Sequence, residues 1–405
     1  MTRITTDIVI SGGGVAGLTA AAAFGSAGFK VICVDPEPPV ITATAPGADL
    51  RSTAFLQPAI AVLQAAGLWE KLAPYAAPLQ IMRIIDAGGV PNEPRRIKDF
   101  DAKDVSDQPF GYNLPNWLLR REMVARLTEL PSVDFRPGVA TKSVLTRQSE
   151  ARVTLTDGTA ISAKLLIGAD GRNSFVRQSL NIGVRTWRYG QKALTFAVTH
   201  PIPHHNISTE IHRSGGPFTL VPLPDRGGMP ASAVVWMTDG AEVQRLAALD
   251  APDFETAINA RSCHILGPLT LASPRMVWPI ISQMADHLTG ERTALMAEAA
   301  HVMPPIGAQG LNMSLTDIAT LLGLAIATPG TLGDATMLDA YQSARHRDIQ
   351  TRVIGIDALN RASMLGAPAL RDLRGAALNA LYAVTPLRKA LMRTGLGLRR
   401  SQNLA

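Results

Sequence analysis

The chain has few of the residues from which metal, disulfide and membrane-spanning sites are built. Only two of its 405 residues are cysteines, Cys33 and Cys263, and neither belongs to a C-x-x-C or other metal-ligand spacing. Aromatic residues make up only 5% of the chain. No uncharged apolar run reaches the roughly eighteen residues that span a bilayer, and residues 1–6 are too short for a signal peptide. We therefore expect a cytoplasmic protein in which Cys33 is a buried, inert thiol.

Charge is also scarce, and it is concentrated at one end of the chain. Charged residues make up 18% of the chain, and its formal net charge is +6. From Arg371 onward there are seven basic residues and one acidic residue, Asp372, which also gives +6. The remainder is formally neutral, which argues against a generally basic nucleic-acid-binding protein. The length and the 46% of hydrophobic residues allow two domains and a sizeable core.

The strongest local pattern lies in the first 35 residues. Residues 8–10 are β-branched and predict a buried parallel strand, residues 18–27 predict a helix, and residues 31–34 predict a second strand. Between the first strand and the helix, the G-x-G-x-x-G motif consists of Gly12, Gly14 and Gly17, with Val15 and Ala16 inside it. Such glycines permit a tight turn, backbone approach to a pyrophosphate and close helix packing. Asp35 ends the second strand at a spacing suited to a ribose hydroxyl pair. These features together predict a nucleotide site.

The rest of the chain predicts further helices, a hairpin and a second sheet. Residues 49–72 read as a segment that carries Arg51 into a helix, and residues 118–127 as another helix. Asp157-Gly158 predicts a type I′ hairpin, after which residues 165–169 return to the nucleotide-binding sheet. Strand-like runs between residues 191 and 238 favour an antiparallel sheet, and the chain turns helical again from about Leu311. The predicted fold is α/β, with a Rossmann-like domain, an inserted antiparallel sheet and a helical C-terminus.

Four motifs give the chain a family resemblance over nearly its whole length. They are Gly12-Gly13-Gly14-Val15-Ala16-Gly17, then Asp49-Leu50-Arg51-Ser52-Thr53-Ala54, then Gly168-Ala169-Asp170-Gly171-Arg172-Asn173-Ser174 with Arg177, and finally Ala299-Ala300-His301 with Pro304-Pro305-Ile306-Gly307-Ala308-Gln309-Gly310-Leu311-Asn312. In this order they resemble the single-component FAD-dependent aromatic hydroxylases, and within them the ubiquinone-biosynthesis hydroxylases. The resemblance implies FAD as the cofactor and NAD(P)H as a transient co-substrate.

The resemblance also implies roles for individual residues. Gly12, Gly14 and Gly17 would hold the FAD pyrophosphate, and Asp35 its adenosine ribose. Further FAD-supporting residues would be Arg51, Arg120, the second-fingerprint pair Asp170 and Gly171, and the turn Gly310, Leu311 and Asn312. The Asp170-Gly171 pair is implicated in NAD(P)H use. The turn would present N–H groups to the pyrimidine edge of the flavin, where negative charge gathers on reduction.

One motif departs from the family pattern. Where the family has Gly-Asp, with the Asp bonding the flavin ribityl chain, this chain has Ala297-Glu298. Glutamate keeps the charge and lengthens the side chain, while alanine adds a Cβ atom. We expect the site to have relaxed around Glu298. The alternative is weakened flavin binding.

The resemblance implies a function and a division into domains. The function is a monooxygenase that hydroxylates the ring of a polyprenyl phenol or benzoquinol in ubiquinone biosynthesis, with NAD(P)H and O2. Two alternatives stay open, namely a flavoprotein lipid oxidoreductase without oxygen insertion and a non-catalytic lipid-binding scaffold that has lost flavin use. The FAD-binding domain would comprise residues 1–75, 100–185 and 285–350, the substrate domain residues 76–99 and 186–284, and a basic helical tail residues 351–405.

Because the flavin carries the chemistry, we expect no catalytic side chain and no metal site. His204 and His205 follow Pro203 in a loop pattern and are interpreted as solvated, and His301 as a supporting histidine. Candidate substrate strands are residues 219–222 and 234–236, and Trp187, Trp236 and Trp278 are either pocket or core aromatics.

The tail offers a hypothesis about partners. Apolar residues at helical spacing alternate with its basic residues, as in a membrane-surface helix. They are Leu373, Ala377, Leu381, Val384, Leu387 and Leu391. A peripheral position on the inner face of the membrane or a place in a biosynthetic complex would follow. Docking of the helix on the protein's own core is the alternative.

Overall fold

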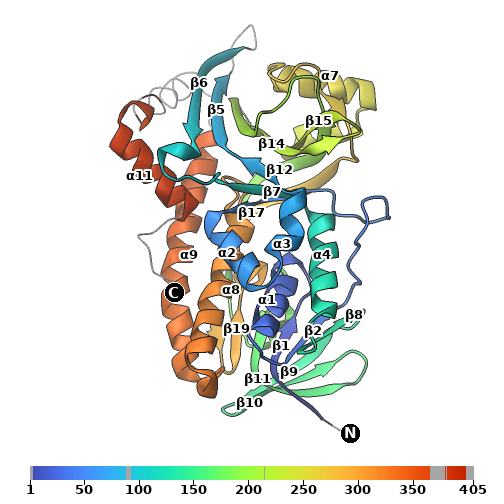
Figure 1. The fold of residues 1–405 in the computed structure, drawn as a ribbon, viewed down its shortest axis with the longest axis vertical. Helices are drawn as coiled ribbons and strands as arrows, with labels where there is room; N and C mark the ends of the chain where they lie inside the picture. The colour runs from blue at the N-terminus through green and yellow to red at the C-terminus, as the bar shows by residue number, and fades with distance from the viewer. Residues whose placement is uncertain (1–2, 88–92, 214, 365–378, 380, 398–405) are drawn as a thin grey trace.

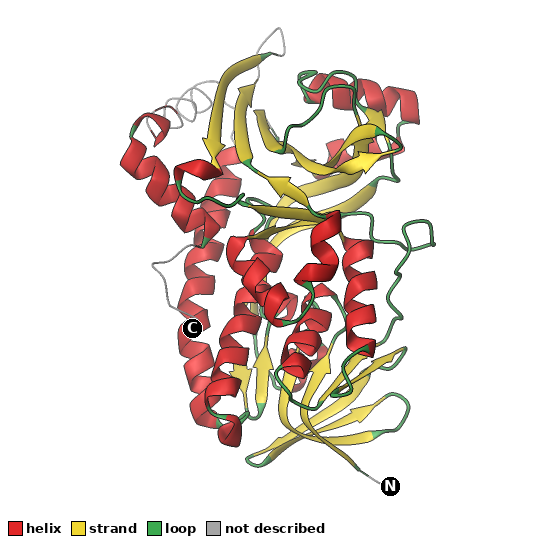
Figure 2. Ribbon diagram, in the orientation of Figure 1, coloured by secondary structure: helices red, strands yellow, loops and turns green. Residues whose placement is uncertain are grey.

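The computed structural model describes residues 3–87, 93–213, 215–364, 379 and 381–397. Two large sheets lie toward opposite ends of the described part, and most of the helices lie alongside the first of them (Figures 1 and 2). A three-stranded sheet joins the two ends. It consists of β3 (Ser52–Leu56), β7 (Gly111–Pro115) and β4 (Ala77–Leu79).

The first sheet is built around the apolar strand predicted at the N-terminus. This strand, β1 (Ile4–Ser11), runs parallel to β2 (Val31–Asp35) on one side and to β11 (Ala160–Gly168) on the other. The chain leaves β1 toward β2 through α1 (Val15–Ser26), while β11 joins from the opposite side, so the strand order reverses at the end of β1. Ligands bind at such switch points in α/β sheets. The other strands are β8 (Val133–Pro137), β9 (Thr141–Arg147), β10 (Glu150–Leu155), β18 (Thr289–Gly290) and β19 (Thr293–Leu295).

Helices cover this sheet because their apolar faces need burial. The alanine-rich α1 packs against α4 (Asn116–Thr128), α2 (Gln57–Ala65) and α8 (Gln309–Ala327). The long α9 (Ala335–Met364) packs against α8 in turn (Figure 1). The remaining short helices here are α3 (Trp69–Leu72), α5 (Phe175–Ser179), η1 (Ala73–Tyr75), η2 (Ala102–Asp104), η3 (Ala297–Ala299) and η4 (Pro329–Thr331). This arrangement confirms the predicted α/β fold.

The second sheet is mostly antiparallel, as the sequence predicts, with one parallel pair between β13 and β5. Its strands follow the order β20-β17-β12-β15-β14-β13-β5-β6, with β16 paired to β12. They are β5 (Ile81–Ala87), β6 (Pro94–Asp101), β12 (Val184–Thr199), β13 (Ile207–Arg213), β14 (Gly216–Arg226), β15 (Met229–Asp239), β16 (Thr270–Leu271), β17 (Met276–Ala285) and β20 (His301–Val302). One face carries α6 (Gly240–Ala248) and α7 (Ala251–Arg261), which pack on Phe196, Phe218 and Trp236.

Three local predictions need correction or refinement. Arg51 leads first into strand β3 and only then into a helix, because the backbone of residues 52–56 pairs with β7. The hairpin at Asp157-Gly158 is present, but it is not type I′, since Gly158 has a positive φ of 87° and Asp157 does not. α9 runs unbroken through residue 350, where the tail was predicted to begin.

α8 is the one described helix that is long and apolar enough to cross a membrane by length and composition alone. Half of its most apolar stretch is buried inside the protein, against α1, α2 and α9. A core helix passes the same test of length and composition. The packing identifies α8 as a core helix.

Candidate functional site

A cavity of about 800 Å³ opens between the two large sheets, at the end of β1. Its walls combine the glycine loop after β1, the loops after β2 and β11, η3, the first turn of α8 and strands of the second sheet. All the residues predicted for FAD line this cavity except Asn312. The structure thus brings together four motifs that are far apart in the sequence.

The glycine loop is held by backbone contacts that leave no room for a side chain at Gly12 or Gly17. The N–H of Gly12 donates to the carbonyl of Val34 at 2.8 Å, and the N–H of Ala169 donates to the carbonyl of Ser11 at 2.8 Å. A Cβ atom on Gly12 would overlap the Ala169 carbonyl, and one on Gly17 would overlap the Gly12 carbonyl. A Cβ atom on Gly14 would meet nothing within 4 Å. Gly14 therefore faces open cavity at the N-terminus of α1, where free N–H groups and the helix dipole favour a phosphate.

Asp35 closes this loop from β2. Its carboxylate accepts hydrogen bonds from the N–H of Gly13 at 2.5 Å and from the N–H of Glu37 at 2.9 Å. Each oxygen keeps a further lone pair, and the residue lines the cavity. Asp35 is placed to orient the loop and to accept from a ligand hydroxyl.

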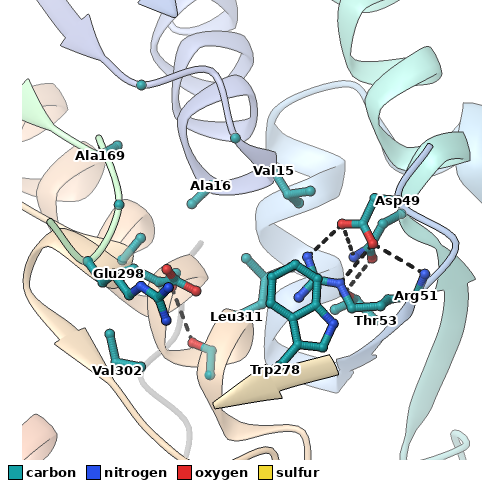
Figure 3. A pocket seen from close by; sticks show the side chains of 18 of the residues that line it. Val15, Ala16, Asp49, Arg51, Thr53, Ala169, Trp278, Glu298, Val302 and Leu311 are labelled. Carbon is teal, nitrogen blue, oxygen red and sulfur yellow. Dashed lines mark hydrogen bonds and ion pairs between the residues drawn. The ribbon is translucent and has the colours of Figure 1, made fainter. Parts of the chain in front are cut away.

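A charged cluster lies on another wall of the cavity (Figure 3). Arg51 donates to both carboxylate oxygens of Asp49, from Nε at 2.8 Å and Nη2 at 2.7 Å, and Asn116 donates to the same carboxylate at 3.0 Å. Burial would raise the pKa of Asp49, but the hydrogen bonds and charge of Arg51, together with Asn116 and the charge of Arg120, outweigh it, so the pKa lies below its ordinary value. The Arg51 guanidinium stacks on the Trp278 ring, with Cζ 4.1 Å from the ring centroid. The cluster therefore fixes a cation beside the cavity.

Arg120 extends this cluster and is only partly satisfied. Its Nη2 lies 3.8 Å from the Asp49 carboxylate, while its buried Nε atom has no hydrogen-bond partner. A buried donor without a partner is costly, and an anionic or carbonyl group of a ligand would remove that cost. Together with the open position at Gly14, this donor shows that the residues present fit a pyrophosphate-containing group such as FAD.

The loop after β11 presents the second predicted pair. Asp170 accepts from Ser174 Oγ at 2.5 Å and from the N–H of Val176 at 3.0 Å, so it supports the first turn of α5, whose N-cap residue is Ser174. Gly171 adopts a positive φ of 82° and also lines the cavity. The carboxylate of Asp170 is therefore fixed in the cavity wall by its own loop.

The departure at Ala297-Glu298 has a clear backbone explanation. Ala297 adopts φ = 55°, the left-handed region that favours glycine, and its N–H donates to Asp317 Oδ2 at 3.2 Å. A glycine at this position would therefore favour the left-handed backbone conformation, and is not needed to make room for a close contact. Glu298 is exposed to the cavity, and Figure 3 shows it on the side opposite Asp49. In this chain alanine therefore occupies a left-handed position in the turn.

The first turn of α8 forms the remaining cofactor-facing wall. The helix begins after Ala308, which is left-handed with φ = 55° and provides no side-chain cap. Gly310 and Leu311 line the cavity, where the N–H groups of the first turn have no acceptor within the helix. The Asn312 side chain instead donates to Ala54 O at 2.7 Å and accepts from the N–H of Leu56 at 2.8 Å. Asn312 thus anchors α8 to β3, and only its backbone remains for the predicted role.

The second sheet supplies an apolar wall to the same cavity. The lining residues from its strands β12, β15 and β17, which form the apolar wall, are Ala193, Thr195, Phe196, Ala233, Val234, Val235, Trp278, Pro279, Ile280 and Ile281. Trp278 donates from Nε1 to Thr195 Oγ1 at 3.2 Å, which fixes its ring. Trp236 is instead core, stacked edge-on against Phe218, and Trp187 lies on the surface. Of the candidate strands, residues 234–235 line the cavity, whereas residues 219–222 do not.

Of the histidines singled out in the sequence, His301 lines the cavity and His204 does not. His204 bonds to the main chain, through Nε2 to Leu223 O at 3.1 Å and through Nδ1 from the N–H of Asn206 at 3.1 Å. Within the described part of the chain, no group of three or more His, Cys, Asp or Glu side chains could hold a metal ion. His301 lines the cavity and pairs with Asp317 at 2.7 Å.

Two contributors were missed at the sequence level. Asp49 was noted only as part of a motif, although it positions Arg51. Asp317 was not singled out at all, yet it is fully buried in α8. A single acidic residue within an apolar helix is a usable signal, since a buried charge needs partners.

Comparisons with known proteins agree with this geometry. A family model described as FAD binding domain matches residues 5–354. Ubiquinone hydroxylase UbiL of Rhodospirillum rubrum is 31% identical, over 96% of this chain and 89% of its own. The 3-demethoxyubiquinol 3-hydroxylase of Escherichia coli is 25% identical, over 98% and 100% of the two chains. Among solved structures, p-nitrophenol 4-monooxygenase PnpA of Pseudomonas putida superposes with a TM-score of 0.79 at 19% identity, over 99% and 100% of the chains, which shows the same fold.

The glycine loop gives a first prediction. Gly14→Val should weaken FAD binding by roughly one to two orders of magnitude, because overpacking a tight contact costs about 1–3 kcal/mol. The FAD-free protein should keep its melting temperature, since the added atoms enter open cavity. FAD fluorescence titration and thermal melting measure the two effects. The comparison variant is Gly17→Ala, which should lower the melting temperature of the FAD-free protein itself; tight FAD binding by Gly14→Val contradicts the assignment.

The left-handed turn gives a second prediction. Ala297→Gly should raise the free energy of unfolding by about 1 kcal/mol, because glycine adopts φ = 55° without the Cβ penalty. Urea denaturation of the FAD-free protein measures the change. As a control, Ala390→Gly in the regular, exposed part of α11 (Thr385–Leu396) should lower stability, since glycine is unfavourable within a helix. A destabilised Ala297→Gly protein would show that the turn gains nothing from glycine.

Proposed function

This chain belongs to the family of single-component FAD-dependent aromatic hydroxylases, and we propose that it hydroxylates the ring of a polyprenylated phenol or benzoquinol in ubiquinone biosynthesis. The chain is an FAD-dependent monooxygenase by its family. The observation that carries the choice of substrate is the apolar wall that the second sheet adds to the cofactor cavity. Among the described residues that line this wall, none is charged.

That wall suits a neutral ring better than an acidic one. A carboxylated or phosphorylated substrate needs a cation or several donors to replace its water. Among the described residues of this wall, only Thr195 has a side-chain hydroxyl, and Trp278 offers a ring face for stacking. The cation in contact with the Trp278 ring is Arg51, and both Asp49 oxygens already hold it. A hydrophobic phenol or quinol fits this chemistry.

Relatives support the same substrate class. The relatives from Rhodospirillum rubrum and Escherichia coli are named for hydroxylation of ubiquinone or demethoxyubiquinol. The match extends over almost the whole of each chain, so it includes the second sheet as well as the FAD-binding part. We carry this substrate class to the present chain as part of the proposal.

The side chains described above would bind FAD, orient the substrate ring and exclude water from the cavity. When bound and reduced by NAD(P)H, FAD supplies the oxygen activation and hydroxyl transfer to the ring. The glycine loop and Arg120 would hold its pyrophosphate, Asp35 its adenosine ribose, and the first turn of α8 its pyrimidine edge. Asp49 would keep Arg51 fixed between the cofactor and the Trp278 ring. The apolar strands would seat the substrate ring and keep water away from it.

We also propose the division of labour between the two sheets. Residues 1–75, 100–185 and 285–350 would bind the cofactor, and residues 76–99 and 186–284 the substrate. The short strand β20 pairs with β17 of the second sheet, so the cofactor-binding part reaches into the substrate sheet at His301 and Val302. This pairing would hold the two halves of the site in register.

The helix α11 supports a peripheral membrane role. One face docks on the protein: Met392 and Leu396 pack with Ala102 and Phe110, and Arg388 pairs with Asp104 at 3.1 Å. Away from these contacts, 42% of Leu387 and 48% of Leu391 are exposed, as is 51% of Val384, the N-cap residue of the helix. Both alternatives for the tail are therefore compatible with this helix.

Basic side chains accompany the exposed row on α11. Arg393 is exposed and Lys389 half-buried on the same helix, while Arg371, Arg374, Leu373, Ala377, Arg399 and Arg400 lie outside the described residues. Exposed leucines next to lysine and arginine suit an anionic membrane surface. We propose that α11 holds the enzyme on the inner face of the membrane, where a polyprenylated substrate resides.

Turnover tests the proposed reaction. With FAD, NAD(P)H and a polyprenyl phenol, the protein should consume coenzyme and O2 together, and the product should carry one atom of 18O from 18O2. Trp278→Ala should lower kcat/KM about two- to tenfold, since an aromatic contact contributes about 0.5–1.5 kcal/mol. The matched control is the surface variant Trp187→Ala, which should behave as wild type. Coenzyme oxidation that yields a product free of 18O would support the non-oxygenating oxidoreductase instead.

Vesicle binding tests the membrane role. Leu387→Ser combined with Leu391→Ser should reduce binding to phosphatidylglycerol vesicles by at least about tenfold, because each leucine contributes up to about 1.5–3 kcal/mol when buried. The melting temperature should not change, since both side chains are exposed. Leu145→Ser, at an exposed site on β9 of the first sheet, is the control. Unchanged vesicle binding by the double variant would favour the alternative that the tail helix only docks on the protein's own core.

A further inference from the structure

His301 is a buried residue of the cavity wall whose two ring nitrogens differ in their partners. The side chain is almost fully buried, with 2% of the residue exposed. Nε2 lies 2.7 Å from Asp317 Oδ2. Nδ1 is buried and has no hydrogen-bond partner in the protein. Since His301 also lines the cavity, the unpaired Nδ1 atom marks a place where a ligand could supply the partner.

Asp317 determines which nitrogen of His301 carries the hydrogen. It is fully buried and accepts from three donors, His301 Nε2, the N–H of Ala297 at 3.2 Å and Arg345 Nε at 2.7 Å. Burial would raise the pKa of Asp317, but the charges of His301 and Arg345 outweigh it and lower the pKa. The carboxylate is therefore ionised and can only accept hydrogen bonds. It follows that Nε2 of His301 is the donor.

Arg345 makes this arrangement rigid. Its Nη1 pairs with Asp348 at 2.6 Å and its Nη2 reaches Met313 O at 3.4 Å, so the guanidinium is held from several sides. Asp317 also pins the left-handed turn at Ala297, next to Glu298. The ring of His301 and the turn that bears Glu298 thus depend on one carboxylate.

With Nε2–H directed at Asp317, Nδ1 is the ring nitrogen left without a partner in the protein. A buried polar atom without a hydrogen bond carries a desolvation cost, which a ligand hydroxyl, able both to donate and to accept, would remove. In the chain His301 lies between Glu298 and the Gly310-Leu311 turn, and all four residues line the cavity. The part of FAD between its pyrophosphate and its ring system is the ribityl chain, which carries hydroxyl groups.

We propose that His301 Nδ1 forms a hydrogen bond with a ribityl hydroxyl of bound FAD, with Asp317 and Arg345 as the positioning residues that fix the ring. Glu298 and His301 then share the contact with the ribityl chain, so the substitution at residue 298 is supported by a second side chain. The inference rests on the cofactor and not on the proposed substrate. Its test therefore stands apart from any turnover measurement.

Two substitutions separate the nitrogens of His301. His301→Gln keeps an N–H near the position of Nε2, which can still donate to Asp317, and loses the atom at the Nδ1 position. It should raise the Kd for FAD about tenfold, which is about 1.4 kcal/mol, with little change in the melting temperature of the FAD-free protein. His301→Asn keeps a polar atom near Nδ1 and loses the bond to Asp317. It should lower the melting temperature of the FAD-free protein and raise Kd by less than His301→Gln.

FAD fluorescence quenching and thermal melting of the FAD-free protein give the two readouts. His287→Gln, at an exposed histidine between β17 and β18, is the matched control and should leave both unchanged. Wild-type FAD affinity in His301→Gln would overturn the proposal and would assign Nδ1 to a bound water. If His301→Asn does not fold, His301→Gln alone still decides, because it keeps the bond to the buried carboxylate.

Discussion

The close approach of two backbone turns at the end of β1 is the constraint on which the rest of the site depends. Gly12 lies against the Ala169 carbonyl, and Gly17 against the Gly12 carbonyl, with no space for a Cβ atom at either glycine. This contact joins the loops after β1 and β11 and sets α1 with its N-terminus facing the cavity. A Cβ atom on Gly14, in contrast, would meet nothing within 4 Å. Backbone packing therefore shapes the loop at which we propose that the pyrophosphate binds.

A second constraint lies on the opposite wall, where one buried carboxylate holds several segments. Asp317 joins η3, β20 and α9 to its own helix, through Ala297, His301 and Arg345. Removing one partner from a buried charge is costly, so these segments depend on one another. This explains how the turn at Ala297 keeps a left-handed conformation that alanine disfavours. The departure from the Gly-Asp pattern is thus accommodated by its surroundings.

The cavity combines the properties of both sheets. Its cofactor side is polar, made of N–H groups, Asp35, Arg120 and the Asp49–Arg51 pair. Its other side is apolar, made of strands whose inner faces have no charge among the described lining residues. Arg51 stacked on Trp278 lies where the two sides meet. A cofactor that performs the chemistry and an apolar ring that receives it require such a division.

The sequence by itself determined the nucleotide-binding unit and the mixed α/β fold, and its family resemblance indicated residues that the structure brings together around one cavity. These features are local, because strand periodicity, glycine spacing and helix signals act over short distances. It did not determine the turn type at Asp157, the strand after Arg51, the roles of Asp49 and Asp317, or which tryptophan faces the cavity. Each of these depends on a partner distant in the chain: β7 for residues 52–56, Arg345 for Asp317, Thr195 for Trp278. Only the tertiary structure decides them, because burial and hydrogen-bond satisfaction are properties of the packed chain.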